Sequence, residues 1–241
     1  MTTQVIKQKR SYMRRRIIGS IIAAVLGLMA PEMTQAQGTM AYLSNLSQPS
    51  AGSLAVGSNS WVAAGVYTGT NPGGYVLNSI QLAMTDASGN PSGFMAMLYN
   101  PLHGGPPSGP GTSLVTLNGS LNPVTAGTYT YAAPSNLTLP PHNEYFIVLT
   151  AETAVANGAY EWSLSGTDSY NPSDGWSNLG GVWTSSNGSF LSWNSTSSFP
   201  QFAIYGTAVP EPGVLSLFVL GGFLLVSRRR KAKAIYEKNN H

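Results

Sequence analysis

Short apolar runs alternate with polar turns along the middle of the chain. From residue 61 to residue 206, runs of β-branched and aromatic residues are separated by Gly, Pro, Asn, Asp and Ser. No long stretch free of Gly and Pro shows the apolar period of a helix. Short strands between turn signals are typical of a sandwich or a barrel. We therefore predict an all-β domain over residues 61–207, an antiparallel, jelly-roll-like β-sandwich of about eight to ten strands.

The predicted strands are the runs richest in β-branched and aromatic residues. The clear ones are Trp61–Tyr67, Val76–Met84, Phe94–Tyr99, Leu114–Leu117, Thr128–Tyr131, Tyr145–Ala151, Ala159–Leu164 and Gln201–Tyr205. Shorter candidates are Leu137–Leu139, Val182–Thr184 and Phe190–Trp193. From Tyr145 to Leu149 every residue is apolar, so both faces of a strand there would be apolar. This predicts a central strand covered on both faces. Asn187-Gly188, between two aromatic runs, predicts a two-residue hairpin turn.

Strict alternation assigns faces to several of these strands. Val76, Ile80 and Leu82 share one parity of their strand, and Trp162 alternates with Glu161. The alternation places Trp162 in the core and Glu161 on a solvated face. The predicted core is Val76, Ile80, Leu82, Phe94, Leu98, Ile147, Leu149, Trp162, Leu164, Phe202 and Ile204.

The beginning of the chain has the order of a secretory signal. Six cations come first, an uncharged apolar run follows over residues 17–30, and small residues lead up to Ala36. We therefore predict a signal peptide over residues 1–36, cut by signal peptidase between Ala36 and Gln37, and a mobile lead-in over residues 37–60. The alternative is an uncleaved membrane anchor, for which the apolar run is short.

The C-terminal segment, residues 208–241, mirrors that order. A Pro-Glu-Pro motif is followed by an apolar run from Val214 to Val226 and then by a cluster of arginines. A helix over this run is about 20 Å long, shorter than the hydrocarbon layer of about 30 Å. We therefore predict a single short transmembrane helix that anchors the chain transiently, with its basic end in the cytoplasm.

The basic character of the chain comes entirely from these two ends. Between Gly38 and Val209 there is no Lys or Arg, whereas six carboxylates give this stretch a formal charge of −6. Binding to nucleic acid or to anionic lipid depends on Lys and Arg, so both partner classes are excluded. The chain has no Cys, so its stability does not depend on disulfides.

Three glutamates are the candidates for acid–base chemistry. Glu144, Glu152 and Glu161 could supply the paired carboxylates of a glycoside-active enzyme. Glu161 has the parity of a surface residue and the other two flank a strand, so solubility also explains all three. We therefore expect no enzymatic activity and keep an enzyme as the third functional alternative.

Oxygen ligands cluster between Asp168 and Asp174. Together with Asn171 they offer the hard ligands that calcium prefers. The spacing differs from that of the helix-loop-helix calcium loop, and such residues are common in turns for backbone reasons. These three residues are the calcium candidates, although we expect neither a metal nor another cofactor.

Three tryptophans follow in a stretch rich in Gly, Ser and Asn. If the rings of Trp176, Trp183 and Trp193 reach solvent, they can stack on the faces of sugars. Packing in the core or across a hairpin is the competing interpretation. These residues are the candidate sugar-stacking side chains.

A series of short motifs runs from Trp61 to Gly206. It includes Gly93-Phe94-x-Ala96-x-Leu98-Tyr99, Tyr145-Phe146-Ile147-Val148-Leu149 and Phe202-Ala203-Ile204-Tyr205-Gly206. This order resembles the choice-of-anchor R domains, bacterial exported β domains that precede varied surface-sorting tails. The resemblance implies no catalytic residues, because the family has none assigned.

The C-terminal segment resembles the PEP-CTERM sorting signal. The matching residues are Pro210, Glu211 and Pro212, with Arg228, Arg229 and Arg230 closing the signal. The resemblance implies cleavage by an exosortase in the inner membrane of a Gram-negative bacterium that makes exopolysaccharide and biofilm. Residues 231–241 extend beyond the usual end of such a signal.

These patterns predict an exported structural or interaction protein of the cell envelope, surface or extracellular matrix. Signal peptidase and an exosortase-type enzyme are its expected processing partners. The alternative is a carbohydrate-binding module that holds matrix exopolysaccharide.

Overall fold

A computed structural model describes residues 39–102, 109–119, 122–189 and 192–210. These residues are built from strands and connecting turns, with one short 3₁₀ helix, η1 (Val155–Asn157). Within these ranges, no helix has the length and apolar character that spanning a membrane requires. The predicted signal peptide and C-terminal helix lie outside the described residues.

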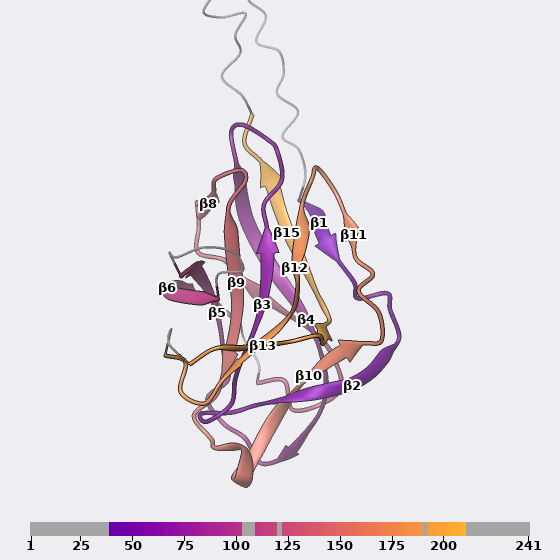
Figure 1. The fold of residues 1–241 in the computed structure, drawn as a ribbon, viewed down its shortest axis with the longest axis vertical. Helices are drawn as coiled ribbons and strands as arrows, with labels where there is room; N and C mark the ends of the chain where they lie inside the picture. Colours follow the sequence, from indigo (N-terminus) through magenta and orange to yellow (C-terminus); the bar gives the residue numbers. More distant parts are fainter. Residues whose placement is uncertain (1–38, 103–108, 120–121, 190–191, 211–241) are drawn as a thin grey trace, which may run out of the picture. The chain divides into compact units, whose positions relative to one another are not determined.

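Two antiparallel sheets make up the fold (Figure 1). The nine-stranded sheet has the order β11 (Asn171–Pro172), β1 (Met40–Ser44), β15 (Phe202–Ala208), β4 (Tyr75–Gly89), β10 (Gly158–Ser165), β14 (Phe199–Pro200). Three further strands extend it, with β2 (Ser50–Val56) on β10 and with β7 (Gly127–Ala132) and β8 (Thr138–Leu139) on β4. The six-stranded sheet has the order β13 (Asn194–Thr196), β12 (Ser177–Ser185), β3 (Trp61–Tyr67), β9 (Glu144–Thr150), β5 (Met95–Pro101), β6 (Pro110–Thr116). The prediction of an all-β, antiparallel fold is therefore confirmed.

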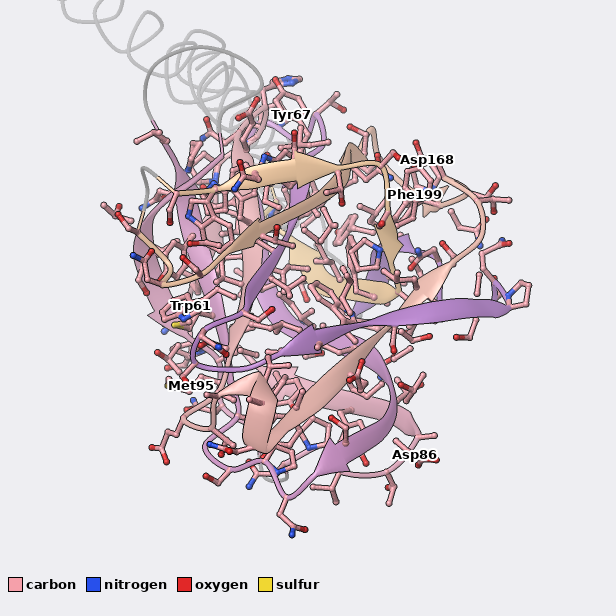
Figure 2. All side chains as sticks on the ribbon, turned by 60° about the horizontal axis from the view of Figure 1, so that its bottom comes forward. Trp61, Tyr67, Asp86, Met95, Asp168 and Phe199 are labelled. Atoms are coloured by element: carbon pink, nitrogen blue, oxygen red, sulfur yellow. The ribbon has the colours of Figure 1, made fainter. Side chains whose placement is uncertain are left out.

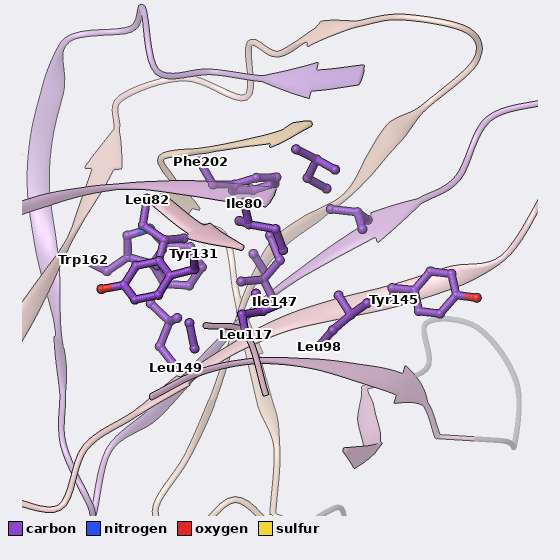
Figure 3. Close-up of a cluster of buried hydrophobic side chains, with 14 of the residues drawn as sticks. Ile80, Leu82, Leu98, Leu117, Tyr131, Tyr145, Ile147, Leu149, Trp162 and Phe202 are labelled. Atoms are coloured by element: carbon purple, nitrogen blue, oxygen red, sulfur yellow. The ribbon is translucent and has the colours of Figure 1, made fainter. Parts of the chain in front are cut away.

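The core fills the space between the two sheets (Figure 3). Ile80 and Trp162 project into it from the nine-stranded sheet, and Ile147 projects from β9 of the six-stranded sheet. The indole N–H of the fully buried Trp162 donates a hydrogen bond to the carbonyl of Gln201 at 2.9 Å. Core positions predicted correctly are Ile80, Leu82, Leu98, Ile147, Leu149, Trp162, Phe202 and Ile204. Phe94 and Leu164 are half-buried.

A β-bulge in β4 changes which of its residues face the core. The register between β4 and β15 shifts at Asn78, which is the extra residue. Tyr75 and Leu77 are buried before the bulge, and Ile80 is buried after it. An unbroken alternation through Asn78 would place Val76 on the same face as Ile80. Because Asn78 is an extra residue, the alternation is interrupted there, and the predicted burial of Val76 is wrong. Val76 is half-buried.

Strand β9 lies in the middle of its sheet and is covered on both faces, as its double apolar parity predicts. Ile147 points into the core, and its neighbours Phe146 and Val148 point to the opposite face. On that outer face they belong to a second apolar group, which we call the outer cluster. The outer cluster consists of Ala63, Met97, Tyr99, Phe146, Val148 and Trp183, with Trp61, Leu179 and Trp193 packed against it.

The prediction that residues 37–60 form a mobile lead-in is wrong for residues 40–44 and 50–56. They form β1, which pairs with β15, and β2, which pairs with β10. Tyr42 and Leu43 are buried in the core. Both strands are held by partners far along the chain, and the apolar run in β1 is too short for alternation to reveal it.

Candidate binding site

The three candidate sugar-stacking tryptophans lie in different environments. Trp176 is in the core, where its ring stacks on Tyr42 at 5.4 Å and meets the edge of Tyr75 at 5.1 Å. It is 2% exposed. A Cβ at Gly69 would lie 2.8 Å from the Trp176 ring, so the neighbouring backbone also packs closely. Trp176 is therefore closed to a sugar.

Trp183 and Trp193 both belong to the outer face of the six-stranded sheet. Trp183 meets the ring of Phe146 edge-on at 5.0 Å and is 4% exposed, so its ring is covered. Trp193 packs on the same outer cluster but is only half-buried, and it lines a surface hollow. Of the three tryptophans, Trp193 is the one that a ligand can reach.

The hollow at Trp193 has a volume of about 440 Å³. Its wall comes from the turn between β2 and β3, from the end of β12 and from the start of β13. We call it the Trp193 hollow. The lining residues are Asn59, Ser60, Thr184, Ser185, Ser186, Ser192, Trp193 and Asn194. None of these side chains is charged, and every one except Trp193 carries a hydroxyl or an amide.

Hydrogen bonds also connect residues at the end of β12 with the loop that carries Ser186, Ser192 and Trp193. The hydroxyl of Ser185 accepts from the backbone N–H of Gly188 at 2.9 Å and lies against the hydroxyl of Ser192. Ser192 in turn donates to the side-chain oxygen of Asn187 at 2.8 Å. Gly188 has a φ of 68°, and a Cβ there would overlap the ring of Trp61. Local polar contacts therefore link the end of β12 to Asn187, Gly188 and Ser192.

This loop corrects the hairpin prediction. Strands β12 and β13 do pair, but the pair nearest the loop is Thr184 with Asn194. Asn187-Gly188 thus turns within a longer loop rather than closing a two-residue hairpin. Of the candidate strand Phe190–Trp193, the first two residues lie outside the described ranges, and the strand that follows begins at Asn194. The longer loop makes room for the hollow.

Two of the lining residues, Thr184 and Ser186, have side-chain hydroxyls that make no hydrogen bond to another described residue. The amide of Asn194 makes one long contact, 3.5 Å to the carbonyl of Ser192. Asn59 accepts the backbone N–H of Val155 through its side-chain oxygen at 2.9 Å, which leaves its amide N–H groups unused. The hollow therefore offers donors and acceptors that nothing in the described protein satisfies.

Two of the three calcium candidates, Asp168 and Asp174, have carboxylates that already accept hydrogen bonds from other side chains. The carboxylate of Asp174 accepts a hydrogen bond from the hydroxyl of Tyr75 at 2.6 Å, and that of Asp168 accepts from the amide of Asn178 at 2.5 Å. Asn171 is exposed and belongs to β11, which pairs with β1. Among the described residues, no three acidic or histidine side chains gather as metal ligands would. Figure 2 shows Asp168, like Asp86, at the periphery of the side chains.

Tyr75 joins the core to Asp174. Its ring is buried, and its hydroxyl accepts the backbone N–H of Asn71 at 2.9 Å while donating to Asp174. Burial, followed by the hydrogen bond to Asp174, raises the pKa of Tyr75 to about 12. Asp174 thus supports a neutral tyrosine in the core. We call Tyr42, Tyr75, Asp174 and Trp176 the Trp176 cluster.

The three glutamates lie on different parts of the fold. Glu144 begins β9 and Glu152 follows its end, so an extended strand separates them by about 26 Å. Paired carboxylates of a glycosidase lie about 5–10 Å apart. Glu161 is on β10, in the other sheet, and accepts a hydrogen bond from Ser53 at 2.8 Å. Glu144 also borders a second hollow, of about 450 Å³, with Asn143, Tyr145 and residues 100–102, 111 and 112.

Comparison with known proteins identifies no family. No protein-family profile matches the chain, and no curated protein matches it. One similar solved structure holds the cysteine protease and lectin-like domains of Cwp84, a surface layer associated protein of Clostridium difficile. It has 12% identity and a TM-score of 0.39, and the match covers 63% of this chain and 32% of that one. Another is the clostridial cysteine protease Cwp84 after propeptide cleavage, with 11% identity, a TM-score of 0.44, and coverage of 71% and 40%. The chain therefore spans less than half the length of either structure.

Proposed function

We propose that the protein is an exported structural or interaction protein of the envelope, surface or extracellular matrix of a Gram-negative bacterium. Signal peptidase removes its N-terminal signal, and an exosortase-type enzyme recognises the C-terminal segment and cuts near Pro210-Glu211-Pro212. The short C-terminal helix anchors the chain until that cut. The processed domain then acts by binding to other components of the envelope or matrix.

The observation that carries the proposal is the position of the two ends of the folded unit. The compact unit runs from Gln37 to Val209, so it begins after the predicted signal cut and ends before the Pro-Glu-Pro motif. Its first and last strands, β1 and β15, are antiparallel neighbours, with Met40 opposite Gly206 (Figure 1). Both ends thus leave the domain at the same place. This arrangement suits a domain held by two membrane segments during export.

The end of the unit is also tied down. The backbone N–H of Val209 donates to the carbonyl of Gly74 at 2.9 Å, and the amide of Asn71 donates to the carbonyl of Val209 at 3.0 Å. A Cβ at Gly73 would overlap that same carbonyl, so glycine is required for the close approach. Pro210 is exposed. The first residue of the predicted sorting motif therefore follows directly on a fixed backbone and is exposed, which supports the proposal that a processing enzyme acts at this point.

Intact mass spectrometry of the exported protein tests this proposal. We expect a chain that starts at Gln37 and ends close to Glu211. Trypsin provides an internal check, because the absence of Lys and Arg from residue 17 to residue 227 leaves the domain uncut. The motif variant Glu211→Ala should retain the C-terminal segment, and the matched variant Glu152→Ala should be processed normally. Surface-exposed wild-type protein that still carries Arg228 to His241 would contradict the proposed processing.

A further inference from the structure

We infer that Asn118 is a site of spontaneous deamidation. Asn118, Asn157 and Asn187 are the three asparagines of the chain that precede a glycine. Glycine has no side chain to shield its backbone nitrogen, so this nitrogen reaches the neighbouring asparagine amide more easily than that of any other residue. The structure leaves this reaction open at Asn118 and hinders it at Asn157 and Asn187.

The reaction consumes only water, and its two reacting groups are neighbours in the chain. The backbone nitrogen of Gly119 loses its proton and attacks the side-chain amide carbon of Asn118, which closes a five-membered succinimide ring. The bond from that carbon to the amide nitrogen breaks, and the nitrogen leaves with the proton as ammonia. Water then breaks one of the two C–N bonds of the ring. Breaking the new bond gives aspartate, whereas breaking the original peptide bond gives isoaspartate.

Both reacting groups are accessible at Asn118. Asn118 and Gly119 are exposed, and Gly119 borders a hollow of about 160 Å³ that has room for water. Within the part of the chain that the structure describes, no hydrogen bond engages the side-chain amide of Asn118 or the backbone N–H of Gly119. The carbonyl of Asn118, in the same peptide group as the Gly119 nitrogen, accepts the backbone N–H of Ala132 at 2.7 Å. This bond draws electron density from the nitrogen, so its proton is lost more easily.

The corresponding atoms at Asn187 are held by hydrogen bonds. The backbone N–H of Gly188 donates to the hydroxyl of Ser185 at 2.9 Å. The side-chain oxygen of Asn187 accepts from the backbone N–H of Ser189 at 2.9 Å and from the hydroxyl of Ser192 at 2.8 Å. The nitrogen that must attack and the amide that must turn toward it are therefore both engaged, and these bonds have to break before the ring can close.

The attacking nitrogen is also held at Asn157. This residue ends η1, and the backbone N–H of Gly158 donates to the carbonyl of Val155 in that 3₁₀ turn. Gly158 is buried, and a Cβ there would lie 2.8 Å from the backbone nitrogen of Asn90, so the surrounding backbone is closely packed. Asn157 is exposed, but its neighbour's nitrogen is not free to attack.

The position of Asn118 gives the modification a structural consequence. Asn118 and Ala132 form a bridge in which each backbone N–H donates to the other's carbonyl at 2.7 Å. Asn118 follows β6 of the six-stranded sheet and Ala132 ends β7 of the nine-stranded sheet, so this bridge joins the two sheets. An isoaspartate adds a methylene group to the backbone inside the bridge, which then cannot keep both bonds. A Cβ at Gly119 would overlap the buried ring of Tyr131, so packing favours the glycine that makes Asn118 reactive.

Timed incubation of the purified protein in mildly alkaline buffer tests the inference. Peptic peptides analysed by mass spectrometry locate each amide that has become an acid, and electron-transfer fragmentation distinguishes isoaspartate from aspartate. We expect deamidation at Asn118 to be at least about fivefold faster than at Asn157 or Asn187, because each of the latter must first lose a hydrogen bond. In concentrated urea the three rates should become similar, since the folded structure no longer protects any of these asparagines.

Two variants check the stated causes. Asn118→Gln keeps an exposed amide but lengthens the side chain, so the five-membered ring cannot form and the change at this position should disappear. Ser185→Ala removes the acceptor of the Gly188 N–H and should speed deamidation at Asn187 by about two- to tenfold while leaving Asn118 unchanged. Equal rates at the three asparagines of the folded protein, or a lead of Asn118 that persists in urea, would overturn the inference. Neither result bears on how the two ends of the chain are processed.

Discussion

Trp176 and Trp193 are seventeen residues apart in the same Gly-, Ser- and Asn-rich stretch, yet one is sealed in the core and the other borders a polar hollow. Both bury an indole N–H that has no protein partner among the described residues. Trp176 lies where the chain passes from β11 in one sheet to β12 in the other, so its ring closes the space between the sheets. Trp193 lies in a hairpin loop within one sheet. The kind of connection, rather than the local composition, decides which ring is accessible.

The largest expected effect on stability comes from a pair of alanine substitutions that compares the two tryptophans. Trp176→Ala should reduce the free energy of unfolding by about 3–5 kcal/mol, because it removes a fully packed ring between Tyr42 and Tyr75. Trp193→Ala should cost about 1–2 kcal/mol, since its side chain is half-buried. Urea unfolding of the exported protein measures both values. Similar losses for the two variants would show that the rings are not in different environments.

The Trp176 cluster should also make stability depend on alkaline pH. Tyr75 has a pKa of about 12 in the folded protein, against about 10 in the unfolded chain. A raised tyrosine pKa means that the folded state retains its proton after the unfolded state has lost it. The resulting stabilisation is complete below about pH 10 and is lost as the pH rises toward 12.

Substitution of Tyr75 tests this pH dependence. In Tyr75→Phe the decline of the unfolding free energy between pH 10 and pH 12 should be shallower than in the wild type, as measured by urea unfolding at a series of pH values. Asp174→Asn is the matched partner variant, because it removes the charge beside the Tyr75 hydroxyl while keeping an acceptor. Parallel pH curves for wild type and Tyr75→Phe would rule out Tyr75 as a source of the alkaline loss.

A smaller effect is expected where the chain leaves the domain after β15. Asn71→Ala removes the two hydrogen bonds from its amide to the carbonyls of Gly74 and Val209, at a cost of about 1–2 kcal/mol. The loss is local, so β15 should fray from its end. Limited proteolysis with thermolysin followed by mass spectrometry should give a core that ends before Val209. Asn90→Ala, at an exposed position, is the control, and an unchanged C-terminal boundary in Asn71→Ala would contradict the role of Asn71.

The sequence predicts strands where the local pattern is regular. Trp61–Tyr67 coincides with β3, and the double parity of Tyr145 to Leu149 correctly indicates a central strand. The alternating pattern gives the wrong face where a strand contains an extra residue. The bulge at Asn78 is such a place, because nothing in the order of apolar and polar residues marks it. The pattern also fails for β1 and β2, which are defined by partners more than a hundred residues away.

The candidate site was only partly predictable for the same reason. Trp193 stands out as an aromatic residue in a polar stretch, and the sequence places it among the candidates for sugar stacking. Asn59 and Ser60 carry no such signal, because they join Thr184 and Asn194 only through the pairing of β3 with β12. Single serines and asparagines are frequent in this chain, so a cluster of them in space leaves no trace in the order of residues.

The smallest expected effect concerns calcium at the edge of the Trp176 cluster. A chelator should leave the melting temperature unchanged, because Asp168 and Asp174 already accept hydrogen bonds from Asn178 and Tyr75. Asp174→Ala should lower the melting temperature by the same amount with and without chelator, since the loss comes from the hydroxyl of Tyr75 left without its acceptor. Glu152→Ala, at an exposed position after β9, is the control for removing a carboxylate. A melting temperature that falls on chelation in the wild type but not in Asp174→Ala would establish a bound cation, because only a ligand held by Asp174 stabilises the fold in that way.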